Sequence, residues 1–121
     1  MGVGLFDRAG EDWRQLELRE GTRELLEHMT ARQYSDKVRF VVLFGSEARG
    51  EARLLSDVDI AVISDEPLSR KELLETHPEI SLDCASIDYR IINTLVSELG
   101  SQKYLDVNYH IRQEGLVIYE G

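Results

Sequence analysis

The chain is poor in cysteine, in proline and in basic side chains. Its 121 residues include a single cysteine, Cys84, and only two prolines. A lone cysteine cannot form an internal disulfide, so a disulfide-stabilised secreted domain is excluded and a reducing, cytoplasmic setting is expected. Cys84 is interpreted as a small core residue.

Long apolar runs are also absent. No run approaches the length that crosses a bilayer, and the first residues lack the charged-then-apolar layout of a signal peptide. We therefore expect no membrane association. At this length, with 42% hydrophobic residues, the chain predicts one domain over residues 1–121. Residues 1–10 hold three glycines and are expected to be a loosely ordered lead-in.

Basic residues are outnumbered, with 14 Lys and Arg against 23 Asp and Glu, for a net charge of −9. This balance argues against a broad nucleic-acid surface, which needs a basic stripe. It does not exclude a nucleotide, for which one or two local cations suffice. It also favours a basic protein partner over an acidic one.

Residues 41–63, VVLFGSEARGEARLLSDVDIAVI, contain the chemistry. Two apolar runs read as buried strands, and the second opens with Asp57 and Asp59. Residues two apart on a strand share a face, so these carboxylates lie side by side and repel unless a cation sits between them. Mg²⁺ prefers such oxygen ligands. Taken alone, the pair favours the alternative that Asp57 only caps the strand; Gly45-Ser46 upstream favours metal binding.

The first strand breaks at Gly45 and Ser46. Gly45 lets the backbone turn and lets a ligand approach, and Ser46 is expected to open a short helix over residues 47–52 whose N–H groups bind an anion. Arg49 is the cation expected to meet triphosphate oxygens. The alternative is that Arg49 pairs with Asp57 or Asp59 and only stabilises the loop.

The rest of the chain predicts strands over residues 38–44, 57–63, 79–87 and 116–119. Helices are expected over residues 12–32, 69–76, 88–99 and 103–113, the first interrupted near Gly21 with Thr22 as a cap. Trp13 is expected to be a core or groove anchor. Asp83, inside an apolar strand, is costly to bury without a partner and is the expected third carboxylate. Asp88 is the competitor, interpreted instead as a helix cap.

The order of these motifs resembles the polymerase-β-type nucleotidyltransferase superfamily: an apolar strand, Gly-Ser, about ten residues, then Asp-x-Asp in a second apolar strand. The form FGSEARGEARLLSDVDIAV is similar to its minimal nucleotidyltransferase branch, small proteins often encoded as antitoxins beside a helical HEPN-type toxin. The resemblance covers roughly residues 38–119, including a tail similar to the family's usual ending. It implies an α+β nucleotidyltransferase fold, a small mixed sheet flanked by helices.

The resemblance also implies a site and a reaction. Asp57, Asp59 and Asp83 would be the catalytic and metal-binding residues, holding two Mg²⁺ ions. Gly45, Ser46 and Arg49 would bind the nucleotide. AMP would pass from ATP to a hydroxyl, expected on a tyrosine of a HEPN-type toxin. Two other classes stay open, namely a non-catalytic partner that silences a toxin by contact and a nucleotide sensor, and a homo- or hetero-oligomer is possible.

Overall fold

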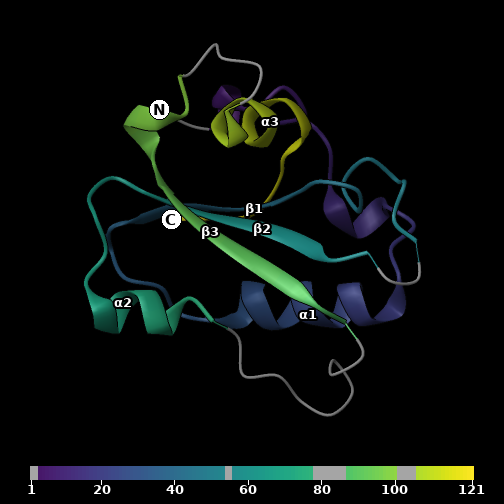
Figure 1. Cartoon of the computed structure of the whole chain (residues 1–121), viewed down its shortest axis with the longest axis horizontal. Helices are drawn as coiled ribbons and strands as arrows, with labels where there is room; N and C mark the ends of the chain where they lie inside the picture. The colour runs from purple at the N-terminus through teal and green to yellow at the C-terminus, as the bar shows by residue number, and fades with distance from the viewer. Residues whose placement is uncertain (1–2, 54–55, 78–86, 101–105) are drawn as a thin grey trace.

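The computed structural model describes residues 3–53, 56–77, 87–100 and 106–121. Four strands form one sheet in the order β3-β2-β1-β4 (Figure 1). The strands are β1 (Val38–Phe44), β2 (Val58–Ser64), β3 (Tyr89–Leu95) and β4 (Leu116–Glu120). Helices α1 (Glu20–Ala31) and α2 (Arg70–Glu75) lie on one side of the sheet, and α3 (Val107–Glu114) lies on the other. This arrangement confirms the expected mixed fold of a small sheet flanked by helices.

Strand direction determines which ends meet. Strand β1 is antiparallel to both β2 and β4, whereas β2 is parallel to β3. The C-terminal end of β1 therefore lies at the same edge of the sheet as the N-terminal ends of the other three strands. Within the described residues, no helix has the length and apolarity needed to span a bilayer.

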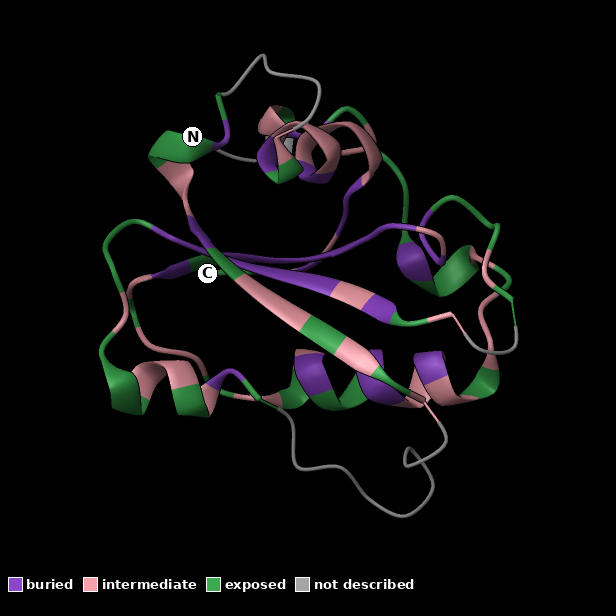
Figure 2. Ribbon diagram, viewed as in Figure 1, coloured by how far each residue is buried: buried purple, intermediate pink, exposed green. Residues whose placement is uncertain are grey.

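The sheet separates two apolar cores, and β1 and β2 run between them almost fully buried (Figure 2). The α1 side holds Leu25, Leu26 and Met29 against Val41, Leu43, Val58, Ile60 and Val62. The α3 side holds Ile111, Leu99 and Phe6 against Phe40, Val42, Phe44, Ala61 and Ile63. Burial on both faces explains why these two strands are near-continuous apolar runs.

Several elements were correctly predicted. Strand β1 spans the expected residues, β2 is displaced by one residue and β4 extends one residue further. Helix α2 begins after Ser69, whose hydroxyl accepts a bond from the Glu72 N–H while the Glu72 carboxylate accepts one from the Ser69 N–H. This reciprocal capping is a local signal, which the sequence alone reveals. Trp13 is buried in the α1-side core, as expected.

The helix predicted over residues 88–99 is wrong. Residues 89–95 form strand β3, followed by the short 3-10 helix η4 (Val96–Glu98). The aromatic and β-branched side chains Tyr89, Ile91, Ile92 and Thr94 favour a strand, and pairing with β2 satisfies it. The strand predicted over residues 79–87 falls almost entirely outside the described residues.

The N-terminal helix differs from its prediction. A 3-10 helix, η2 (Trp13–Gln15), is followed by a break, and α1 then runs through Gly21. Thr22 is not a cap but a fully buried residue inside α1. The helix accommodates Gly21 because the Ile87 side chain fills the space that a Cβ at this position would occupy.

The lead-in packs onto the domain, which the sequence did not indicate. It contains the short helix η1 (Val3–Leu5), after which Phe6 is buried edge-to-face on Phe40 with 5.1 Å between ring centroids. The Asp7 N–H donates to the Arg112 carbonyl at 3.0 Å. Residues near the start of the chain therefore cover the α3 side of the sheet.

Candidate functional site

The predicted site residues that the structure describes gather at the end of the sheet where β1 stops and the other strands begin. Asp59 is paired with Phe44 of β1 on one side and with Arg90 of β3 on the other. Gly45 directly follows Phe44, and Asp57 is exposed just before β2. The antiparallel course of β1 thus brings the Gly-Ser corner to the Asp-x-Asp pair, as the sequence motif implied.

Gly45 contacts Asp59 so closely that a side chain at position 45 would displace the Asp59 carboxylate. Its φ of 79° lies in the left-handed region, and a Cβ there would overlap the Asp59 Oδ2 and lie 3.1 Å from the Asp59 Cγ. Glycine is therefore required twice, by the backbone turn and by the carboxylate beside it. This contact fixes the position of the Asp59 carboxylate, which is 13% exposed, against the corner.

The helix predicted over residues 47–52 is a turn instead. Residues 46–50 are turn residues, closed by bonds from the Arg49 N–H to the Gly45 carbonyl at 3.1 Å and from the Glu51 N–H to the Ser46 carbonyl at 2.8 Å. Gly50 ends the turn with a φ of 73°. The left-handed glycine at position 50 stops the chain from continuing as a helix.

The side chains of Glu47 and Arg8 anchor this turn to the segments packed against it. Glu47 is buried, and its carboxylate accepts from the Arg19 Nε at 2.8 Å and from the Thr22 hydroxyl. Arg8 donates to the Ala48 carbonyl. A buried carboxylate needs such partners, and they tie the turn to α1 and to the N-terminal segment.

Arg49 pairs with neither aspartate. Its Nη1 lies 3.1 Å from both carboxylate oxygens of Glu114, at the end of α3, and its Nε lies 3.0 Å from Glu51. The hydrogen bond to Glu51 and the charge of Glu114 raise the pKa of Arg49. The structure thus places Arg49 at the same edge as Gly45 but engaged with other carboxylates.

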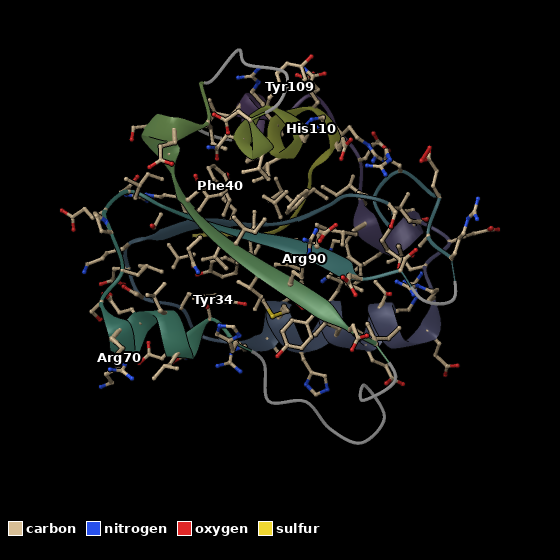
Figure 3. The ribbon with its side chains drawn as sticks, in the orientation of Figure 1. Tyr34, Phe40, Arg70, Arg90, Tyr109 and His110 are labelled. Carbon is tan, nitrogen blue, oxygen red and sulfur yellow. The ribbon has the colours of Figure 1, made fainter. Side chains whose placement is uncertain are left out.

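Asp59 is held instead by Arg90. The Arg90 Nη2 and Nε lie 2.8 and 2.9 Å from the Asp59 Oδ1, and the Arg90 side chain is 64% exposed (Figure 3). The hydrogen bond and charge of Asp59, then the more distant charge of Asp57, raise the pKa of Arg90. A cation therefore already offsets part of the negative charge of the Asp-x-Asp pair.

Asp83 lies outside the described residues, so its position is not tested. Asp88 is described and is not a helix cap. Its carbonyl accepts from the Val58 N–H at 2.8 Å, just before β3. Since Val58 is in register with Tyr89, Asp88 lies level with Asp57, and strand alternation puts both on the face of Asp59.

Among the described residues, no three His, Cys, Asp or Glu side chains are already arranged to hold a metal ion. The donor chemistry nevertheless fits Mg²⁺, because Asp57 and Asp59 offer hard oxygen donors two residues apart at the start of β2. The Asp59 Oδ1 is bonded to Arg90, so a metal ion at this oxygen competes with the guanidinium.

A cavity of 330 Å³ opens beside these groups on the α3 side of the sheet. Its lining comes from the β1 corner, the start of β2 and helix α3: Phe44, Gly45, Arg49, Asp59, Val107, His110 and Glu114. The volume lies within the range of small-molecule pockets. Figure 3 shows His110 on α3, and its Nδ1 lies 3.7 Å from Glu114.

Sequence reasoning missed Arg90, Glu114 and Glu47. Arg90 lies two residues after Asp88 in the stretch SIDYRII, so the two would share a face of a strand. Predicting a strand for this stretch would have placed both residues beside Asp57 and Asp59. Glu114 and Glu47 carry no comparable local signal, because their partners lie far away in the chain.

The chain was compared with known proteins. Two crystal structures are similar to the chain: a toxin–antitoxin with AMP-PNP, at 21% identity and a TM-score of 0.48, and the toxin–antitoxin MntA-HpeT mutant D39ED41E, at 18% identity and 0.46. The alignments cover 84% and 85% of this chain and 72% and 75% of those chains. No curated protein matches.

The model of one protein family, described as polymerase beta, nucleotidyltransferase, matches residues 26–121. The matched region includes all four strands, the Gly45-Ser46 corner and the Asp-x-Asp pair. The chain therefore belongs to the polymerase beta nucleotidyltransferase family.

Proposed function

We propose that this protein transfers a nucleoside monophosphate, AMP from ATP, to a hydroxyl group. The close contact of Gly45 with Asp59 is the observation that carries the proposal. This contact places a backbone corner suited to phosphate beside a carboxylate suited to a metal ion. Nucleotidyl transfer requires both groups at the same site.

Five residues at this end of the sheet have a role in the proposal. Asp57 and Asp59 hold Mg²⁺, with two ions expected, and Gly45, Ser46 and Arg49 bind the triphosphate. When bound, Mg²⁺ neutralises negative charge on the phosphate oxygens. The protein contributes by fixing these groups in place, so most of its catalysis is positional and electrostatic.

The reaction is an in-line displacement at the α-phosphorus. The acceptor hydroxyl oxygen forms the new bond to phosphorus, the bond to the bridging oxygen of the β-phosphate breaks, and pyrophosphate leaves. The hydroxyl proton goes to the third carboxylate, directly or through water.

Asp83 and Asp88 are the candidates for that third carboxylate. The objection to Asp88 was its interpretation as a helix cap, and β3 removes this objection. Asp88 lies just before the neighbouring strand, level with Asp57, and this position supports it as the third carboxylate. Replacing it with Asn is expected to lower transfer about 100-fold or more, the scale of a lost general base. If Asp83→Asn has this effect and Asp88→Asn does not, Asp83 is the third carboxylate.

The acceptor we propose is a tyrosine of a HEPN-type toxin, which would make this chain an antitoxin. The sequence resemblance to the minimal nucleotidyltransferase branch supports this, and so does the net charge of −9, which suits a basic partner.

The test is incubation with α-labelled ATP and Mg²⁺, with and without the protein encoded beside this one. We expect label on that neighbour, and none with the Asp57→Asn, Asp59→Asn double variant. Label that persists with the double variant would show that the site is assigned wrongly.

The acidic charge also supports a second candidate, toxin silencing by surface contact alone. In that case no label reaches the neighbour, the two proteins still bind tightly, and the double variant neutralises as well as the wild type.

A further inference from the structure

Glu114 lies in the anion-binding part of the site. One carboxylate oxygen accepts from the Gly45 N–H at 3.3 Å, and both lie 3.1 Å from the Arg49 Nη1. Gly45 and Arg49 are two of the groups assigned above to the triphosphate. The carboxylate of Glu114 therefore makes the contacts that a phosphate oxygen would make.

The position of Glu114 in its own helix is unfavourable. It is the last residue of α3, where the exposed carbonyl groups carry partial negative charge and a cation is preferred. Its own carbonyl accepts from Arg8 at 3.2 Å. The end of the helix does not stabilise a negative charge, so the side chain is held by its contacts with Arg49 and the Gly45 N–H, with His110 of the same helix 3.7 Å away.

Burial distinguishes Glu114 from the other carboxylate on Arg49. The Glu114 side chain is 19% exposed and lines the cavity that also contains Asp59, whereas Glu51 is 64% exposed and does not line it. Glu51 neutralises Arg49 from solvent. Glu114 does so from inside the site, where a ligand has to go.

On the basis of the nucleotidyltransferase function above, we propose that Glu114 is a built-in placeholder for the triphosphate, which an incoming nucleotide must displace. While in place, it keeps Arg49 and the Gly45 N–H oriented and paired. A ligand exchanges with it only if its charge on Arg49 exceeds that of one carboxylate. The site thereby selects a polyanion, such as a nucleoside triphosphate, over a singly charged anion.

Glu114→Gln tests the placeholder, since the amide keeps the shape and an acceptor oxygen but loses the charge. We expect ATP and inorganic triphosphate to bind roughly fivefold more tightly, the scale of one partly exposed ion pair. AMP should gain less, because it carries less negative charge for the Glu114 carboxylate to repel. Glu51→Gln is the matched control, expected to change affinity by less than about twofold because its pair is solvent-exposed.

Isothermal titration calorimetry measures these affinities, with EDTA and then with Mg²⁺. Glu114→Ala is the second variant and should act in the same direction if the glutamine variant is poorly folded. Weaker binding by both Glu114 variants, or a gain no greater than that of Glu51→Gln, would overturn the placeholder. If the wild-type protein transfers AMP but the Glu114 variants bind ATP no more tightly, the placeholder proposal fails and the proposed function stands. If no variant binds ATP, both proposals fail.

Discussion

Replacing Gly45 by alanine tests the contact on which the site is built. The substitution places a methyl group at a φ of 79° and against the Asp59 Oδ2. The left-handed conformation costs alanine roughly 1–2 kcal/mol. The stiffer unfolded chain offsets about 0.4–1 kcal/mol of that cost. Pushing Asp59 aside also breaks its pair with Arg90, worth up to about 1 kcal/mol.

The expected loss is therefore about 2 kcal/mol in the free energy of unfolding, or close to 8 °C in melting temperature. Transfer should fall far more than stability, because Asp59 leaves its position. Urea unfolding followed by circular dichroism gives the first quantity, and labelled ATP gives the second.

Gly50→Ala is the matched control. Gly50 has a φ of 73°, but a Cβ there meets nothing within 4 Å. It carries the backbone cost without the collision, so the loss should be about 1 kcal/mol or less. If both variants lose equal stability and equal activity, the reasoning about Gly45 and Asp59 is refuted.

Three further perturbations probe neighbouring features. Arg90→Met should raise Mg²⁺ affinity about threefold by freeing Asp59, measured calorimetrically with a non-transferable ATP analogue, and an unchanged affinity would contradict the competition. Glu47→Gln should cost about 2 kcal/mol in urea unfolding, because Arg19 loses its partly buried partner; a loss under about 0.5 kcal/mol would show that the pair does not anchor the turn. Burial raises the pKa of Tyr34 to about 12, which ultraviolet titration of tyrosinate checks. The free energy of unfolding should therefore fall as pH rises from about 10 to about 12. Tyr34→Phe should lose this pH dependence.

Local signals predicted a large part of the fold. Strands β1 and β2 could be predicted because burial on both faces produces a continuous apolar run in the sequence. Helix α2 was readable because Ser69 and Glu72 cap it within one turn. Strand β3 was not, because it lies at a sheet edge with a half-exposed pattern, and only its pairing with β2 decides its conformation.

The same division holds for the candidate site. The amino-acid sequence by itself determined that a Gly-Ser corner follows one buried strand and that an Asp-x-Asp pair opens the next, since these features are encoded within residues 41–63. Only the tertiary structure decided the partners of the charged groups. Arg49 faces Glu114, and Asp59 faces Arg90, because the sheet order brings together residues 65 and 31 positions apart. Sequence spacing carries no information on such pairs, because their energy depends on distance in space and on burial.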